Sequence, residues 1–570
     1  MRIVRTGHPP APVSRAAGLD DHRPGDGRPA LRAPGRSALR QRIPSALLVA
    51  AAAVGALMLL PLAYLILRSG DADAGTWDVI LQPRTLGLAF RSAALAVCVT
   101  AASCAIGVPL AWLTARTDLP GRRAWTVVVA LPLVIPSYIG AFALIGALGP
   151  QGMLQETLAG PLGVERLPDI SGFPGALLAL TLFTYPYVYL VVAAAIRGLD
   201  PSLEDASRVL GRSPWATFWS VTVPLLKPSI AAGGLLVALY TLHDFGAVSL
   251  MRYNVFTQAI YVQYRGAFDR TPAAILSLML VGLAGIVLVL EQRARGRARY
   301  YRSGAGSKRP VTAVRLGRWR WPALGLCCGV ALVALVLPVG VIIFYLVRGL
   351  AGGETLSLSW SAAGGSIVVS ASAAVLAVVA ALPVAFLSAR YPGRVSVAAE
   401  RLSYSGYALP GLVVALAFVF FSANFTPMLY QSLPLVVIAY VVLFLPQAAE
   451  PIRGALLQLS PRIEEAGRAL GKGRLKVFGS LVAPLIARGA IAGGGLVFLT
   501  AMKELPATLL LRPTGFETLS TRVWTGATAG LFSRAAAPAL LLIIVCAFPL
   551  YGLARRVEVR EMQDVEVRAE

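Results

Sequence analysis

The chain has 570 residues, of which 56% are hydrophobic and 14% are charged, and its formal net charge is +24. A soluble domain carries roughly 25% charged residues, so this composition excludes an ordinary soluble protein and predicts a chain that lies mostly in lipid. The positive charge is typical of arginines beside membrane spans that face anionic lipid, and nucleic-acid binding is the weaker interpretation of it.

Twelve apolar stretches follow one another along the chain, and each approaches the length of about 20 residues that crosses a bilayer as a helix. The predicted fold class is therefore an all-α polytopic membrane protein with two tandem six-helix halves, residues 45–290 and 322–555. The predicted spans are 45–67, 88–115, 126–148, 174–196, 229–250, 273–290, 322–347, 365–389, 402–423, 433–449, 489–511 and 535–554.

Arginine is distributed unevenly between the two sides of these spans. The segment 1–44 and the linker 291–321 carry nine arginines each, whereas 149–173 is nearly neutral. The positive-inside rule places the arginine-rich segments, and with them both termini and the tail 556–570, in the cytoplasm. An even number of spans in each half makes the halves parallel. Segment 1–44 is also rich in proline and glycine, which predicts disorder.

A polar segment between the fourth and fifth spans occurs twice, at 199–228 and at 459–488. Each copy has a glutamate, a glycine seven residues later and a proline thirteen residues after that. The residues in question are Glu204, Ala206, Gly211 and Pro224 in the first copy, and Glu464, Ala466, Gly471 and Pro484 in the second. A repeat with this period indicates duplication of a whole domain.

Each of these two segments, which we call islands, is predicted to form two short helices joined at the glycine. In the first copy Asp200 stands before a proline, an order typical of a helix N-cap. We expect Glu204 to pair with Arg208 one turn later, and Gly211 to adopt the left-handed conformation that ends a helix. The second helix is expected to end at Pro224. Such a bent element fits a groove on another protein, and an amphipathic connector on the membrane surface is the alternative.

The islands resemble the EAA loops of ABC importer permeases, which contain Glu-Ala-Ala, a glycine seven residues after the glutamate and a later proline. Residues 204–206 read Glu-Asp-Ala and residues 464–466 read Glu-Glu-Ala, so the second position departs from alanine in both. In that family the loop is the coupling helix that sits on an ATPase subunit. The resemblance implies two cytoplasmic ATPase subunits, an external substrate-binding protein and a place in the bacterial inner membrane.

The chain has no nucleotide site of its own. A P-loop requires GxxxxGK[ST], and the nearest string, Gly471-Lys472-Gly473, lacks the first glycine and the final hydroxyl. The histidines do not cluster with carboxylates, and the five cysteines lack CxxC spacing. We therefore expect no enzymatic activity, no cofactor and no metal site, and ATP hydrolysis by partner subunits.

The resemblance is sharpest at residues 242–270 and 502–540, which are similar to the fused two-half permeases of ferric iron importers. Thiamine permeases share this architecture, so thiamine or another small solute remains an alternative cargo. A proton-driven secondary transporter with two parallel six-helix halves is a further alternative, as is a receptor or scaffold without transport. Neither explains the repeated islands.

Asp244 and Glu504 occupy equivalent positions deep inside the predicted fifth spans. A carboxylate at this depth is costly unless it faces a cavity or a partner. The helix is expected to loosen just afterwards, at Gly246 and Pro506. One interpretation is a structural ion pair between the halves. The other is a translocation pathway, which the family resemblance favours because the fifth span lines that pathway there.

Overall fold

The computed structural model describes residues 43–70, 82–150, 152–156, 168–266, 271–295, 313–353 and 360–547. Within these ranges the ordered segments are helices, and one isolated bridge between Thr117 and Val314 is the only extended pairing. The predicted tails, except residues 43 and 44, and most of the basic linker lie outside the described residues.

The helices of the first half are grouped here with the short 3₁₀ and π turns, which carry the letter η. They are α1 (Ser45–Gly70), α3 (Pro83–Arg116), α4 (Arg122–Val128), η2 (Leu131–Val134), α5 (Ser137–Leu148), α7 (Phe173–Gly198), α8 (Pro201–Val209), α9 (Pro214–Thr217), η3 (Phe218–Thr222), α10 (Val223–His243), α11 (Gly246–Leu250), α12 (Phe256–Gly266) and α13 (Thr271–Arg295).

The second half repeats this order. Its elements are η4 (Gly317–Trp319), α14 (Arg320–Ala331), η5 (Leu332–Val336), α15 (Leu337–Ala351), α16 (Trp360–Arg390), α17 (Arg394–Ser403), η6 (Tyr404–Ala408), α18 (Gly411–Phe425), η7 (Pro427–Leu429), α19 (Leu433–Gln458), α20 (Pro461–Ala469), α21 (Arg474–Val477), η8 (Phe478–Val482), α22 (Ala483–Lys503), α23 (Pro506–Leu511) and α24 (Leu519–Thr528), followed by an apolar helix at Phe532–Ala547.

The predicted all-α polytopic class is confirmed in the described ranges. Ten helices there are long and apolar enough to cross a membrane, and one pair bent by 100° makes an eleventh candidate. The shorter helix Phe532–Ala547 stands where the twelfth predicted span begins.

The third predicted span of each half is broken at a proline, whereas the sequence predicted a helix that is only kinked there. In the first half α5 begins directly after Pro136, and in the second α18 begins directly after Pro410. Proline has no backbone N–H and keeps the residue before it out of the helical region, so the helix must start anew. Ser137 and Gly411 thereby become first residues of helices inside the protein.

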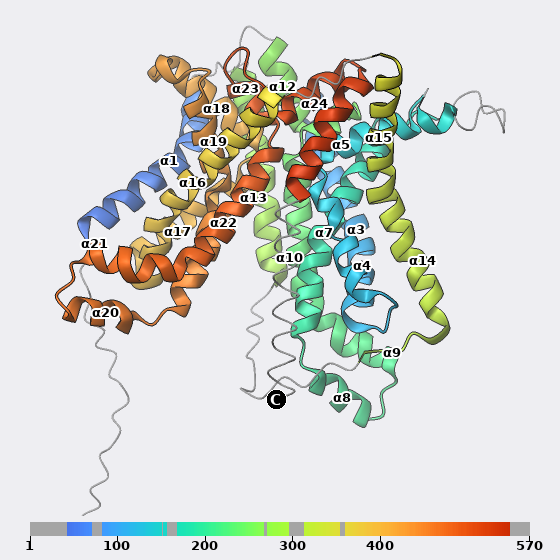
Figure 1. Ribbon diagram of the computed structural model, residues 1–570, viewed down its shortest axis with the longest axis horizontal. Coiled ribbons are helices and arrows are strands. Elements are labelled where there is room, and N and C mark those ends of the chain that lie inside the picture. The colour runs from blue at the N-terminus through green and yellow to red at the C-terminus, as the bar shows by residue number, and fades with distance from the viewer. Residues whose placement is uncertain are drawn as a thin grey trace, which may run out of the picture. The chain divides into compact units, whose positions relative to one another are not determined.

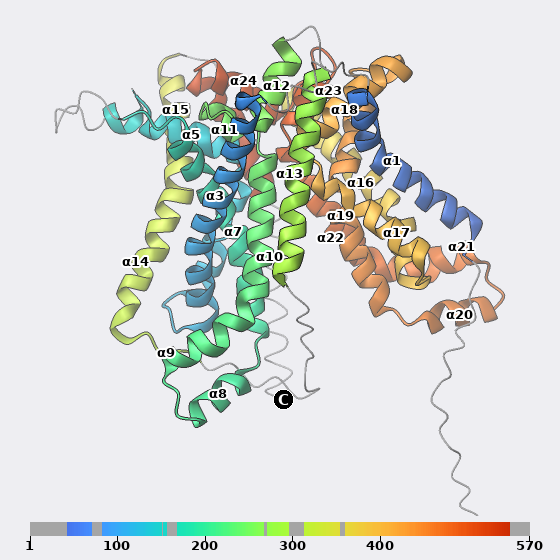
Figure 2. The same cartoon turned by 180° about the vertical axis from the view of Figure 1, so that it is seen from behind.

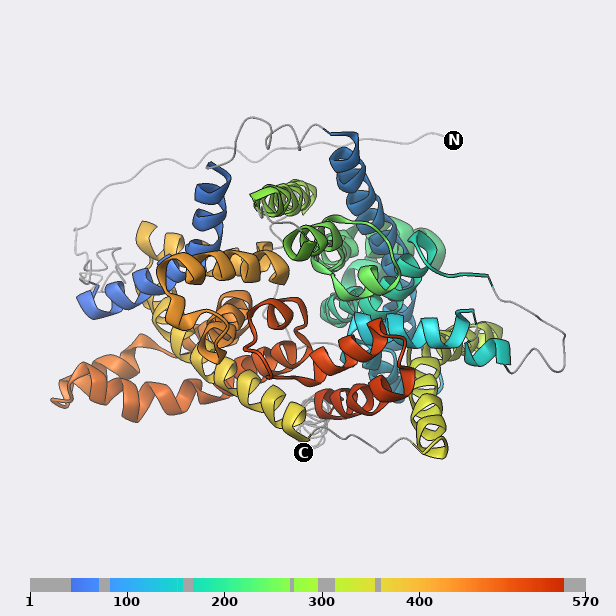
Figure 3. The same cartoon turned by 90° about the horizontal axis from the view of Figure 1, so that it is seen from above.

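The first helix of each half packs against the opposite half. In Figures 1 and 2, α1 lies among the gold and orange helices of the second half, where it contacts α16, α17 and α18. Conversely α15 contacts α5, and the Tyr345 hydroxyl donates to the Gly146 carbonyl at 3.1 Å. Figure 3 shows the same exchange from above. The halves are therefore interlocked, and each covers apolar surface of the other.

The end of the linker is fastened to the first half just before α14. Val314 donates its N–H to the Arg116 carbonyl at 2.9 Å and accepts one from Asp118 at 3.1 Å. The Asp118 carboxylate in turn accepts the N–H of Leu316 at 2.8 Å. These bonds fix the start of the second half beside the end of α3.

Two equivalent glycines allow the fifth span of each half to lie tightly against the fourth. A Cβ added to Gly233 of α10 would lie 2.8 Å from Val188 Cα, and one added to Gly493 of α22 would lie 2.9 Å from Ala448 Cα. The close approach recurs at the same place in both halves, so the repeat extends from the sequence to the packing.

Gly493→Val is expected to lower the melting temperature of the detergent-purified protein by several degrees, because overpacking a tight contact costs about 1–3 kcal/mol. Gly495→Val, two residues further along the same helix, is the matched control, since a Cβ there meets nothing within 4 Å. Equal melting temperatures for the two variants would contradict the packing described.

Candidate functional site: the islands and the carboxylates of the fifth spans

Each island forms two short helices joined at a glycine, as predicted. Asp200 caps α8 by accepting the N–H of Ser202 at 3.0 Å, and this hydrogen bond lowers the pKa of Asp200. Ser460 caps α20 in the same way. Gly211 and Gly471 have φ of 81° and 77°, in the left-handed region that favours glycine.

The second helix of each island does not end at its proline, contrary to the prediction. In the first copy α9 runs through the π turn η3 into α10, and Pro224 lies in the first turn of α10; Pro484 has the same place in α22. A wide turn is tolerated before a residue that has no N–H to donate. Each island is therefore continuous with the fifth span.

Glu204 is buried, and its partner lies on another helix. Its carboxylate pairs with Arg116 at the end of α3 and accepts the Thr222 hydroxyl at 2.9 Å. Glu204 is 8% exposed and Arg116 is 7% exposed. The predicted pair with Arg208 is wrong, because the carboxylate turns away from the exposed face of α8.

The second island repeats this anchor. Arg390 Nε donates to Glu464 at 2.7 Å, and its Nη1 donates to the Leu459 carbonyl at 3.1 Å. Arg468 Nε donates to the backbone carbonyl of Glu464 at 3.3 Å and does not pair with its carboxylate. Arg390 ends α16 as Arg116 ends α3. Each glutamate therefore ties its island to the second span of its own half.

The outer face of each island is apolar at its tip. Leu210 is 81% exposed and Leu470 is 79% exposed, each directly before its left-handed glycine. Ala206 and Ala466 are exposed one turn earlier on the same face. Figure 1 shows α8 and α20 at one end of the helices, opposite α12 and α24. Two exposed apolar tips at one end are typical of a docking surface.

Asp244 lies in the break between α10 and α11 and caps the shorter helix. One carboxylate oxygen accepts the N–H groups of Ala247 and Val248 at 3.0 and 3.2 Å, and the other accepts the Ser137 hydroxyl. Both oxygens are thus hydrogen-bonded, and among the described residues no cation pairs with this carboxylate.

Glu504 lies in the equivalent break between α22 and α23. Its Oε1 accepts the Ala507 N–H at 3.2 Å. Gly411 stands where the first half has Ser137, and a Cβ added to it would lie 2.5 Å from Glu504 Oε1. The longer glutamate therefore occupies the space that the serine side chain fills in the first half.

Both breaks contact the opposite half. The partly buried Lys503 donates to the carbonyl of Leu133 in η2 at 3.1 Å and does not pair with the adjacent Glu504. The ring of Phe245, next to Asp244, packs on Trp524 of α24 with a centroid distance of 5.0 Å. A movement of one half relative to the other must therefore disturb the surroundings of both carboxylates.

Two tandem halves, each with an anchored island before a broken fifth span, are typical of an importer permease. The family described as the binding-protein-dependent transport system inner membrane component matches residues 107–296 and again residues 377–561. The chain belongs to this family, whose members are multi-pass transport subunits of the inner membrane. This confirms the resemblance drawn from the sequence and favours an ABC importer over a secondary transporter.

Individual relatives carry different cargoes. An Fe(3+)-transport system permease protein of Haemophilus influenzae is 34% identical over 507 residues, covering 88% of this chain and 96% of that protein. A molybdenum transport system permease protein of Escherichia coli is 29% identical over 192 residues, covering 33% of this chain and 82% of its own length. A probable sulfate transport system permease protein of Marchantia polymorpha is 27% identical over 206 residues, covering 35% of this chain and 68% of that protein.

The sequence did not lead us to Arg116 and Arg390 as partners of the glutamates, or to the replacement of Ser137 by Gly411 in the second half. A signal for the arginines was present, because residues 113–116 read Leu-Thr-Ala-Arg and residues 387–390 read Leu-Ser-Ala-Arg. No local signal links either string to an island about 80 residues later, because the contact is tertiary.

Glu204→Gln is expected to lower the thermal stability of the purified protein, because leaving Arg116 buried without its carboxylate costs about 3–5 kcal/mol. The exposed neighbour provides the control, and Asp205→Asn should change stability little. In a double-mutant cycle, adding Arg116→Gln should restore part of the loss. Additive effects of the two single variants would show that the pair does not couple.

Proposed function

We propose that this chain is the permease of an ATP-driven importer of ferric iron. The observation that supports this cargo is the similarity to a ferric-iron permease along 96% of that protein's length. The molybdenum and sulfate permeases match only about one third of this chain. Delivery of the cargo by an external binding protein follows from the family.

The islands are the surfaces on which two ATPase subunits dock in this proposal. The apolar tips at Leu210 and Leu470 enter grooves on the ATPase, and the Glu–Arg anchors keep each island in register with its half. Because α9 and α21 continue into the fifth spans, a displacement of an island is carried directly to Asp244 and Glu504.

The end that bears the islands is cytoplasmic in this proposal, together with both termini. Arg122 and Arg123 at the start of α4, like the arginines near the linker, favour this orientation. The opposite end, where α12 and α24 lie, then receives cargo from the binding protein (Figure 2). Rigid-body movement of the two halves exposes the path alternately to each side.

Leu210→Glu combined with Leu470→Glu is expected to abolish ATP-dependent uptake and co-purification of the ATPase, since a charge in an apolar groove is costly to desolvate. Both positions are exposed, so the melting temperature of the isolated permease should stay unchanged. Glu465→Gln, at an exposed polar position of α20, serves as the control. Normal uptake in the double leucine variant would refute docking through these tips.

Asp244→Asn combined with Glu504→Gln is expected to slow uptake of labelled ferric iron while leaving assembly with the ATPase intact. Neutral amides bind a hard cation less well than carboxylates do. Uptake of thiamine and of molybdate is measured in the same vesicles. Transport of either solute without transport of iron would refute the cargo and leave the permease class standing.

A further inference from the structure

A polar pocket lies beside Glu504 in the second half. It lies between α16, α19, α22 and the start of α24, and oxygen-bearing side chains make up most of its lining. They are Glu504, Ser366, Ser370, Tyr440, Thr518 and Ser520. Hydroxyl and carboxylate oxygens are the ligand atoms that hard cations prefer.

Glu504 has an oxygen available to this pocket, whereas Asp244 has none. The only hydrogen bond that the described residues make to the Glu504 carboxylate is the one from Ala507 to Oε1. Both oxygens of Asp244 are bonded by Ser137 and by the start of α11. The missing serine at Gly411 therefore leaves the second carboxylate free to take a ligand.

The corresponding place in the first half is less polar, although Ser92 and Thr257 stand where the second half has Ser366 and Ser520. The two halves are aligned here by a shared contact, because Ser92 accepts the N–H of Phe256 at 3.1 Å just as Ser366 accepts the N–H of Leu519 at 2.8 Å. By this alignment Ala96 replaces Ser370 in the first half, and Val255 replaces Thr518. The alignment of α7 with α19 places Leu180 where the second half has Tyr440. The polar pocket is thus a departure from the repeat.

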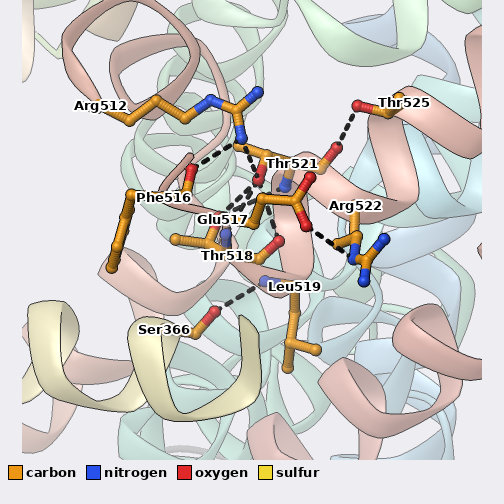
Figure 4. A network of polar contacts seen from close by, with 9 residues as sticks. All are labelled: Ser366, Arg512, Phe516, Glu517, Thr518, Leu519, Thr521, Arg522 and Thr525. Atoms are coloured by element: carbon orange, nitrogen blue, oxygen red, sulfur yellow. Dashed lines mark hydrogen bonds and ion pairs between the residues drawn. The ribbon is translucent and has the colours of Figure 1, made fainter. Parts of the chain in front are cut away.

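One wall of the pocket is held by a hydrogen-bond network, shown in Figure 4. Thr518 and Thr521 bond each other's side chains and backbone as a capping box at the start of α24. Arg512 donates to the carbonyl of Phe516 at 2.9 Å and to the Thr521 hydroxyl at 3.3 Å. The hydroxyls of Ser366 and Thr518 are thereby fixed in place before any ligand arrives.

We propose that Glu504 and the hydroxyls of this pocket form a transient site for a hard cation on the cargo path, and that Asp244 is a positioning residue. The inference rests on the proposed function and narrows it to one half. A single carboxylate among neutral hydroxyls binds weakly, as cargo that must leave requires. The described residues hold no group of three metal-binding acidic, histidine or cysteine side chains that would retain the ion.

The test uses the permease with its ATPase and binding protein in proteoliposomes, with uptake of labelled ferric iron as the readout. Ser370→Ala combined with Thr518→Val gives the pocket the residues of the first half. Uptake is expected to fall roughly tenfold, since each lost hydrogen bond to a charged group weakens binding severalfold. ATP hydrolysis should remain close to that of the unaltered complex, whereas the melting temperature should fall slightly, because Thr518 also caps α24. Ser422→Ala is the control, because that hydroxyl bonds only carbonyls of its own helix.

A second variant separates the charge of Glu504 from its availability. Gly411→Ser combined with Glu504→Asp copies the locked arrangement of the first half, which is known to fit the fold there. It retains the negative charge, yet uptake should fall as far as in Glu504→Gln. Glu504→Gln should in turn lower uptake more than Asp244→Asn, while Asp244→Asn should lower the melting temperature more.

Excess Ga³⁺, a hard ion that is not reduced, should compete with ferric iron in the unaltered complex.

The outcomes are distinguishable. Unchanged iron uptake in both double variants would overturn the pocket and leave the proposed importer standing. Absence of iron uptake by the unaltered complex, with uptake of another solute, would overturn the cargo and the hard-cation site together.

Discussion

The buried pair of Glu204 with Arg116 and the partly buried pair of Glu464 with Arg390 are the interactions on which the arrangement of the islands depends. A buried ion pair adds little net stability, because desolvation of both charges opposes their attraction, but breaking it leaves an uncompensated charge. Its effect is to allow one placement of the island against the second span. Since each island is also continuous with the fifth span, the pair links the second and fifth spans of one half, so that they move together with the island.

The duplication preserved the backbone more strictly than the chemistry. Both fifth spans break at equivalent positions, both carry a carboxylate there, and both meet a helix that starts after a proline. Ser137 with Asp244 and Gly411 with Glu504 nevertheless fill the same space in two ways, because the methylene gained in the glutamate is offset by the side chain lost in the glycine. One carboxylate is saturated and the other is not. A repeat that looks symmetric in its ribbon can therefore be asymmetric at its centre.

Sequence reasoning succeeded where the cause is local. The two short helices of each island and the glycine between them were predicted, because a cap before α8 and a left-handed glycine act within a few residues. It failed where the cause is tertiary: the partners of Glu204 and Glu464 come from another helix, and hydropathy does not indicate which half α1 will cover. The breaks at Pro136 and Pro410 were predicted to be kinks. A helix can break completely at a proline when neighbouring helices satisfy the freed backbone groups, and a local sequence pattern does not show those neighbours.

The exchanged first helices limit how the halves can separate. With α1 on the second half and α15 on the first, the halves cannot part as independent bodies without exposing apolar surface on both sides. The contacts that the breaks of the fifth spans make with the opposite half are smaller. Lys503 donates to the Leu133 carbonyl, and the ring of Phe245 packs on the ring of Trp524. A rotation of the halves about α1 and α15 would keep the contacts of these two helices and replace the contacts of Lys503 and Phe245 with others. The carboxylates of the fifth spans lie at those small contacts, so the same movement that opens the path changes what surrounds them.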